Sequence, residues 1–127
     1  MHHDIILQRK AMNGKTMELV VTEYVHCDLI EINGRIDSYS APQIETVLNA
    51  LMVDNHYNII VNLEDVIFLS SSGILTFVNA QRKLKQQNKG EIVFVNVPEL
   101  VFGSFELAGF HVVFKFFDDI TTAVSRF

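Results

Sequence analysis

Three consecutive serines, Ser70, Ser71 and Ser72, are the residues of this sequence whose type and position could do chemistry. They follow a short apolar run at residues 66–69, which is rich in β-branched and aromatic residues and is predicted to be extended. A helix-like pattern begins after them. Serine is a preferred helix N-cap because its hydroxyl accepts a hydrogen bond from a free backbone N–H of the first turn. One serine can therefore cap the helix while another stays exposed.

A phosphate group on the exposed serine would lie at the positive end of the predicted helix. Free N–H groups and the helix dipole stabilise negative charge there, and phosphorylation adds about −1.5 to −2 charges. Simple capping accounts for the same three residues. The stretch by itself therefore predicts either a cap, or a cap that also carries a phosphorylation switch.

Two catalytic motifs are present only in part. Residues 14–16, Gly-Lys-Thr, match the end of a phosphate-binding loop, but Arg9 stands where that motif needs a glycine. Gly73 follows Ser71 at the spacing of a nucleophile elbow, but Leu69 replaces the leading glycine, and no histidine with an acidic partner can be assigned. We therefore expect a protein that is not an enzyme.

Candidate metal ligands are few. The segment 26–28, His-Cys-Asp, has adjacent ligand types, but adjacent residues on a strand point to opposite faces of the sheet. His56 and His111 fall in predicted loops and are expected to face the solvent. We predict no metal site and no cofactor.

Asp37 lies in the predicted loop before the first helix. In α/β sheets, ligand and partner sites collect in loops that follow the carboxyl ends of strands. A loop aspartate also commonly forms a local turn hydrogen bond with the backbone. A partner-binding role and a purely local role both stay open for Asp37.

The composition fits one folded domain. The chain has 127 residues, 49% apolar and 20% charged, which excludes a disordered chain and two ordinary domains. Its net charge of −5 disfavours nucleic acid or an anionic membrane as a direct partner. Four basic residues that follow the apolar positions of a helix are predicted to form its solvated face: Arg82, Lys83, Lys85 and Lys89.

The expected location is the cytoplasm. Cys27 is the only cysteine, so no intramolecular disulfide can form and a reducing compartment is compatible. No apolar run approaches the ~18 residues of a membrane span, and the first residues do not resemble a signal peptide. We expect a soluble protein without a membrane-spanning segment.

Residues 17–127 are predicted to form one domain, and residues 1–16 a short strand or an ordered arm before it. The predicted order within the domain is β-β-α-β-α-β-α-β-α. Strands that alternate with helices favour parallel βα units with right-handed crossovers. We therefore expect an α/β fold, in which a mixed sheet starts with an antiparallel N-terminal hairpin and continues with parallel βα units whose helices pack on the sheet.

The hairpin, at residues 17–25 and 29–32, is predicted to end at Asn33-Gly34. The first helix is predicted to start with a capping box formed by Ser40 and Gln43. Its apolar stripe comprises Ile44, Val47, Leu48, Leu51 and Met52. Further strands are predicted at residues 59–63, 92–95 and 112–117, and further helices after Gly73, at residues 99–107 and after Asp118-Asp119.

Together these motifs resemble the STAS domain, in particular the bacterial anti-sigma factor antagonists, over residues 17–127. The resemblance depends on five segments in a family-like order and spacing: residues 34–37 (Gly-Arg-Ile-Asp), 60–63 (Ile-Val-Asn-Leu), 68–73 (Phe-Leu-Ser-Ser-Ser-Gly), 90–96 (Gly-Glu-Ile-Val-Phe-Val-Asn) and 107–110 (Leu-Ala-Gly-Phe). Their joint order is more specific than any one of them.

The resemblance implies a regulator without catalytic activity that works by partner switching. In this family the unphosphorylated protein binds an anti-sigma factor, which is also its serine kinase, and frees a sigma factor. Phosphorylation breaks the complex, and a PP2C-type phosphatase restores it. By position the phosphorylated serine is Ser71, with Ser72 and Ser70 as alternatives. The partner-binding residues carried over are Gly34, Arg35, Asp37, Ser70, Ser71, Ser72, Gly73 and Ile74.

One position departs from the family pattern. The motif usually has an aspartate directly before the phosphorylated serine, and Ser70 stands there. A neutral residue removes a carboxylate that could orient the hydroxyl or be read by the kinase. This favours an alternative, a STAS scaffold protein in a signalling complex that is not phosphorylated. A nucleotide-hydrolysing or other serine-dependent enzyme is the third hypothesis.

Overall fold

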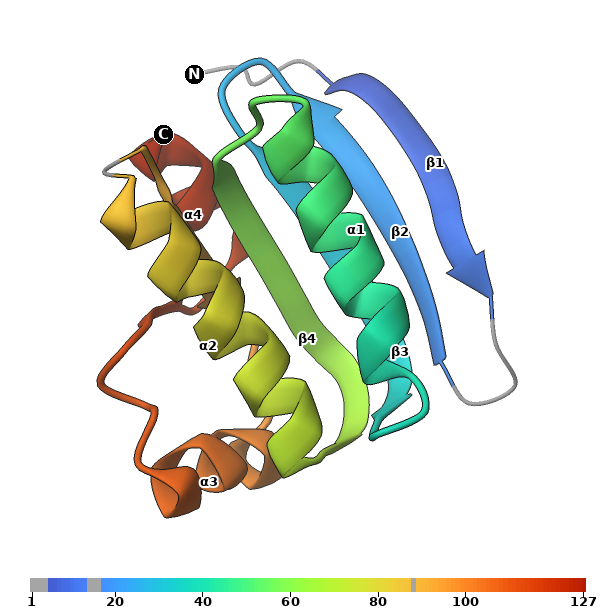
Figure 1. The fold of residues 1–127 in the computed structure, drawn as a ribbon, viewed down its shortest axis with the longest axis vertical. Helices are drawn as coiled ribbons and strands as arrows, with labels where there is room; N and C mark the ends of the chain where they lie inside the picture. The colour runs from blue at the N-terminus through green and yellow to red at the C-terminus, as the bar shows by residue number, and fades with distance from the viewer. Residues whose placement is uncertain (1–4, 14–16, 88) are drawn as a thin grey trace.

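The computed structural model describes residues 5–13, 17–87 and 89–127 of the chain (Figure 1). Residues 14–16, which carry the incomplete phosphate-loop motif, lie outside the described residues. The described elements follow in the order β1 (Ile5–Asn13), β2 (Met17–Tyr24), β3 (Asp28–Ile36), α1 (Ala41–Val53), β4 (Asn58–Leu69), α2 (Ser71–Gln86), β5 (Glu91–Val95), α3 (Glu99–Ala108), β6 (Lys115–Phe117) and α4 (Ile120–Arg126).

The six strands form one sheet in sequence order, β1-β2-β3-β4-β5-β6. Pairing is antiparallel from β1 through β3 and parallel from β3 through β6. This confirms the predicted α/β fold with an antiparallel start and parallel βα units. Residues 5–13 form β1 on the outer side of β2, while the proposed division of the chain at residue 17 stays a prediction.

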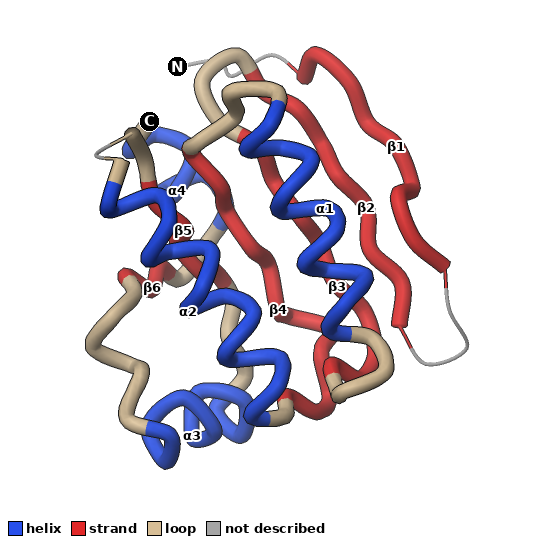
Figure 2. The backbone as a smooth tube through the Cα atoms, viewed as in Figure 1, coloured by secondary structure: helices blue, strands red, loops and turns tan. Residues whose placement is uncertain are grey.

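The helices cover the two faces of the sheet unequally (Figures 1 and 2). α1 and α2 lie on one face, above the larger core, and α3 lies at the end of the sheet near the start of α2. α4 packs on the opposite face against a smaller core that includes Cys27, Ile60 and Val93. Four members of the predicted stripe of α1 are buried, together with Ala41, and the fifth member, Met52, is half-buried.

An aromatic cluster joins α2 and α3 to the sheet. The ring of Phe94 on β5 has its centroid 5.1 Å from that of Phe77 on α2 and 5.0 Å from that of Phe105 on α3. All three side chains are fully buried. Because aromatic rings contribute large apolar areas and prefer such tilted contacts, this cluster packs α2 and α3 firmly against β5.

Three predicted strand boundaries were wrong. β3 does not end at Asn33-Gly34 but continues to Ile36, because Gly34 adopts a φ of 108° and the chain bulges instead of turning. The two apolar runs at residues 59–63 and 66–69 belong to one strand, β4, which has two register shifts against β3. β6 begins only at Lys115, because the residues before it form a turn.

Candidate functional site

Ser70 is the helix cap of the serine stretch. Its hydroxyl oxygen accepts a hydrogen bond from the backbone N–H of Gly73 at 3.2 Å, and its backbone is extended, as an N-cap residue requires. The N–H of Ser70 donates to the carbonyl oxygen of Ile36 at 2.8 Å. The first turn of α2 is thereby tied to the carboxyl end of β3.

Ser71 and Ser72 occupy the first turn of α2, and both are exposed. No acidic side chain stands in that turn, so the positive end of the helix is open to an anion. Among the described residues, no hydrogen bond joins either serine hydroxyl to a histidine or a carboxylate. The arrangement presents hydroxyl groups that can accept a phosphate.

Gly73 and Ile74 hold the start of α2 against the core and so position the serines. A Cβ atom on Gly73 would lie 2.5 Å from Cγ2 of Ile36 and 2.8 Å from Cδ1 of Leu69, so only glycine allows α2 to start this close to the sheet. Ile74 is 2% exposed and belongs to the larger core. Of the predicted partner-binding residues, these two therefore hold the helix in place and offer almost no surface.

The loop between β3 and α1 is built around Asp37 and Ser40. The carboxylate of Asp37 accepts hydrogen bonds from the N–H groups of Tyr39 and Ser40, both at 3.0 Å. The N–H of Ser40 is the main cause that lowers the pKa of Asp37 below its ordinary value. Asp37 therefore makes the local turn hydrogen bonds that were one of its two predicted roles, and these bonds set the shape of the loop.

The predicted capping box at Ser40 was wrong. The buried Ser40 hydroxyl donates to the carbonyl oxygen of Arg35 at 2.8 Å and accepts from the N–H of Asp37 at 2.9 Å, so it braces the loop and does not cap α1. Sequence reasoning therefore missed its role. Asp37 gave a signal for this turn, because an aspartate side chain commonly accepts a hydrogen bond from the backbone two residues further on.

Gly34 and Arg35 lie on β3 beside the end of β4. Gly34 is in register with Val66, and Arg35 with Phe68. The guanidinium of Arg35 lies over the Phe68 ring, 4.3 Å from its centroid, which is a cation–π contact at an exposed position. The structure thus brings Gly34, Arg35 and Asp37 to the same end of the sheet as the serines.

Four exposed apolar side chains, which were not predicted as site residues, lie in the segments that lead into α1 and α2 or in the first turns of α2. Tyr39 in the β3–α1 loop is 87% exposed, and Ile67 near the end of β4 is 73% exposed. Phe68 and Leu75 are also exposed. Tyr39, Ile67 and Phe68 lie near the carboxyl ends of β3 and β4, the end of the sheet at which the serines stand.

His56 and His111, which were predicted to face the solvent, are both half-buried. Nδ1 of His56 lies 2.8 Å from Oδ2 of the buried Asp28. His111 lies beside the Phe102 ring, with centroids 6.3 Å apart. Cys27 is buried, and burial raises the pKa of its thiol to about 11, so it is an unreactive thiol at neutral pH.

The four basic residues that follow α2's apolar positions are exposed, as expected for a solvated helix face. Lys85 pairs with Glu91 at 3.0 Å, and the ammonium of Lys89 lies 5.0 Å from the centroid of the Tyr57 ring. Within the described parts of the chain, no helix has the length and apolar content needed to cross a bilayer.

The family model of the STAS domain matches residues 18–123, and the chain therefore belongs to the STAS domain family. An anti-sigma-B factor antagonist of Staphylococcus aureus (strain NCTC 8325 / PS 47) is 32% identical over 80 residues, which are 63% of this chain and 73% of that protein.

Solved structures agree in fold. An anti-sigma factor antagonist from Mycobacterium paratuberculosis superposes with a TM-score of 0.78 at 19% identity, over 91% of this chain and 97% of that one. The anti-sigma factor antagonist SpoIIAA in its unphosphorylated form gives a TM-score of 0.69 at 20% identity, over 94% and 95% of the two chains. The phosphorylated form of the Bacillus protein SpoIIAA gives 0.64 at 18% identity, over 94% and 98%. The chain is thus similar to anti-sigma factor antagonists both in sequence and in fold.

Proposed function

We propose that this protein is an anti-sigma factor antagonist that acts by partner switching and is controlled at Ser71. The observation that carries the proposal is the exposed hydroxyl of Ser71 in the first turn of α2, beside the capping Ser70, in a chain similar to anti-sigma-B factor antagonists. The unphosphorylated protein binds an anti-sigma factor, which is also its serine kinase, and frees a sigma factor. A PP2C-type phosphatase returns the phosphorylated form to the active state.

The electrostatics of α2 support a switch at this position. A phosphate on Ser71 is stabilised by the open, positive end of the helix, so the modification does not unfold the domain. The same group opposes a partner surface adapted to a neutral hydroxyl. A loss of ~3 kcal/mol in the complex weakens binding more than a hundredfold.

Ser71 is the proposed acceptor because its two neighbours are placed less well. Ser70 is half-buried, and its hydroxyl accepts the capping hydrogen bond from Gly73. Ser72 is exposed but stands one residue further into the helix, where its carbonyl oxygen accepts from Thr76 at 3.0 Å. Ser72 is therefore the second choice and Ser70 the third.

The proposed partner surface consists of the serines, Arg35 and the apolar side chains near them. Asp37 and Gly34 shape its rim, while Gly73 and Ile74 hold the helix start. The protein works in the cytoplasm without catalysis, cofactor, nucleic acid or membrane. Its net charge of −5 favours a protein as the partner over nucleic acid or an anionic membrane.

Incubation with the cognate kinase and ATP tests the site. We expect the intact mass to rise by one phosphate for the unaltered protein and for Ser72→Ala, and to stay unchanged for Ser71→Ala. Ser71→Glu should weaken binding to the anti-sigma factor about a hundredfold, while Ser72→Gln, at the adjacent exposed position, should weaken it far less. Full phosphorylation of Ser71→Ala would contradict the assignment.

A second function is favoured by Ser70. Because a serine stands where the family motif usually has an aspartate, a STAS scaffold protein that is never phosphorylated is the alternative. Intact mass of the protein purified from its own host separates the two. A phosphorylated fraction excludes the scaffold, and its complete absence in all growth phases excludes the switch.

A further inference from the structure

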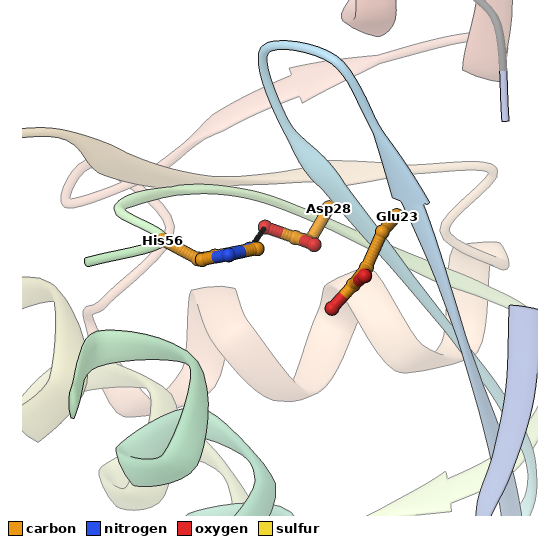
Figure 3. A group of neighbouring side chains, drawn as sticks. All are labelled: Glu23, Asp28 and His56. Carbon is orange, nitrogen blue, oxygen red and sulfur yellow. Dashed lines mark hydrogen bonds and ion pairs between the residues drawn. The ribbon is translucent and has the colours of Figure 1, made fainter. Parts of the chain in front are cut away.

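A second group of potential ligands lies at the opposite end of β3 and β4 from the serines. Glu23 near the end of β2, Asp28 at the start of β3 and His56 in the α1–β4 loop each offer one ligand atom, and these atoms lie within 4.8 Å of one another (Figure 3). We propose that these three side chains bind a divalent transition-metal ion such as Zn²⁺.

The sheet itself brings the two carboxylates together. Glu23 and Asp28 are direct partners in the antiparallel register of β2 and β3, so their side chains share one face. Figure 3 shows the Glu23 side chain next to that of Asp28. Like charges directly opposite each other on a sheet repel, and a cation between them turns this repulsion into attraction.

The C-terminal end of α1 fixes the position of the His56 imidazole. Asn55 takes the left-handed conformation with a φ of 64°, and its N–H donates to the Met52 carbonyl oxygen at 3.1 Å. The N–H of His56 donates to the Leu51 carbonyl oxygen at 2.8 Å. These two bonds form a Schellman motif, which turns the chain back at the end of α1 and aims His56 at Asp28.

The negative end of α1 favours a cation at this position. Carbonyl groups of the last turn carry the negative end of the helix dipole, and His56 follows that turn directly. α1 has no basic side chain in its last turn to neutralise this end. The carboxylates, the imidazole and the helix end therefore all attract positive charge to one place.

The distances suit coordination. Ligand atoms about 2.1 Å from a metal lie about 3.0 Å apart at octahedral angles and about 3.4 Å apart at the tetrahedral angle that Zn²⁺ prefers. Nδ1 of His56 and Oδ2 of Asp28 lie 2.8 Å apart, and the ligand atoms of all three side chains lie within 4.8 Å of one another, which is close to these spacings. To bind the ion through Nδ1, the neutral imidazole takes the tautomer that carries its proton on Nε2, so that the Nδ1 lone pair faces the ion.

The donor set selects the kind of ion. One imidazole nitrogen with two carboxylate oxygens suits Zn²⁺, Co²⁺ or Mn²⁺ better than Mg²⁺, which prefers oxygen ligands only. A pocket of about 200 Å³, lined in part by Asp28 and His56, gives access from the solvent. The positively charged Lys89 lines the same pocket. Its ammonium group donates a hydrogen bond to the Tyr57 hydroxyl at 3.4 Å, and Lys89 is not a member of the cluster.

The site is separate from the proposed switch. β3 has nine residues, so its two ends are about 26 Å apart at about 3.3 Å per residue. A bound ion would link the β2–β3 turn to the α1–β4 loop and leave the serines untouched. Failure of the metal proposal therefore says nothing about Ser71, and the reverse also holds.

Titration of the full chain with Zn²⁺ and Co²⁺ in a calorimeter tests the proposal. Because the sequence begins Met-His-His, every protein carries His2→Gln and His3→Gln, so that these histidines cannot supply the signal. In this background we expect one ion per chain, a Co²⁺ absorption spectrum typical of a nitrogen- and oxygen-bound ion, and a higher melting temperature with Zn²⁺ than with EDTA.

His56→Gln and Glu23→Gln should each weaken Zn²⁺ binding at least about tenfold. Glu18→Gln is the matched control, since it removes the same charge from β2 outside the cluster, and it should leave the affinity unchanged. Circular dichroism checks that each variant is folded. If His56→Gln unfolds, a second measurement replaces its Zn²⁺ affinity. Mn²⁺ added to the background protein should then broaden the backbone amide NMR signals of residues 23, 28 and 56.

Three results would overturn the proposal. They are no binding in the background protein, equal affinity in the Glu23→Gln and Glu18→Gln proteins, and Mn²⁺ broadening centred elsewhere in the chain.

Discussion

The two ends of strands β3 and β4 carry side chains of opposite character. At their carboxyl ends lie hydroxyl groups, free backbone N–H groups and exposed apolar side chains around Ser71. At their amino ends lie a buried carboxylate, a half-buried imidazole and a second carboxylate around Asp28. One end is suited to receive an anion and a protein surface, the other to receive a cation.

The alternation of strands and helices explains this difference. In parallel βα units each helix starts near the carboxyl end of the strand before it and finishes near the amino end of the strand after it. α2 therefore presents its positive end beside Ser71, while α1 presents its negative end beside His56. The fold provides two poles of opposite sign, and the local side chains reinforce each pole.

The largest expected effect comes from Gly90, beside the amino end of β5. A Cβ atom there would lie 2.1 Å from the backbone carbonyl oxygen of Tyr57, which cannot rotate away. Gly90→Ala should therefore reduce the free energy of unfolding by about 3 kcal/mol and displace Tyr57 and the adjacent His56. Urea denaturation measures the first effect, and the Zn²⁺ titration the second.

Gly103→Ala is the control for that substitution. Gly103 is inside α3, where an added Cβ meets nothing within 4 Å, so alanine should raise the free energy of unfolding by about 0.5–1 kcal/mol. Equal stability of the two variants would show that the close approach of Gly90 to Tyr57 has no structural importance.

An intermediate effect is expected at the serine pole. Ser70→Ala removes the hydrogen bond to the Gly73 N–H and should reduce the free energy of unfolding by about 1 kcal/mol. Ser70→Asp keeps the cap and adds a negative charge at the positive end of α2, so it should be at least as stable as the unaltered protein. Thermal denaturation of the two variants measures both effects.

Ser72→Ala is the matched comparison, because the Ser72 hydroxyl makes no capping bond. A loss in Ser72→Ala as large as that in Ser70→Ala would mean that the two serines share the cap. The distinction between a capping serine and a free acceptor serine would then fail.

The smallest effect concerns pH and Asp37. The N–H groups of Ser40 and Tyr39 lower the pKa of this carboxyl from 3.8, so the carboxylate stabilises the fold above that value. The contribution is lost as the pH falls through the lower pKa of the folded state. In Asp37→Asn the melting temperature should therefore fall less between pH 5 and pH 3 than in the unaltered protein. Parallel pH curves for the two proteins would contradict this.

Local patterns in the sequence were sufficient for the architecture. The spacing from Ile44 to Leu51 predicted the buried face of α1, and the compact run at residues 59–63 predicted a central strand, because periodicity follows directly from which face is buried. The strand boundaries failed at Asn33-Gly34. This dipeptide is a common turn signal, but pairing with β2 and β4 on both sides kept it in the sheet.

For the serine stretch, the sequence by itself determined that a strand ends and a helix begins there, and that one hydroxyl could cap while another remained free. Only the tertiary structure decided which serine has which role, because the cap depends on where α2 starts against β3 and β4, and Gly73 lets it start close to Ile36 and Leu69. The cluster of Glu23, Asp28 and His56 could not be predicted from the sequence either, because it too depends on contacts between residues far apart in the chain. His56 is 28 residues from Asp28, and only the parallel pairing of β3 with β4 and the turn at the end of α1 bring the two side chains together.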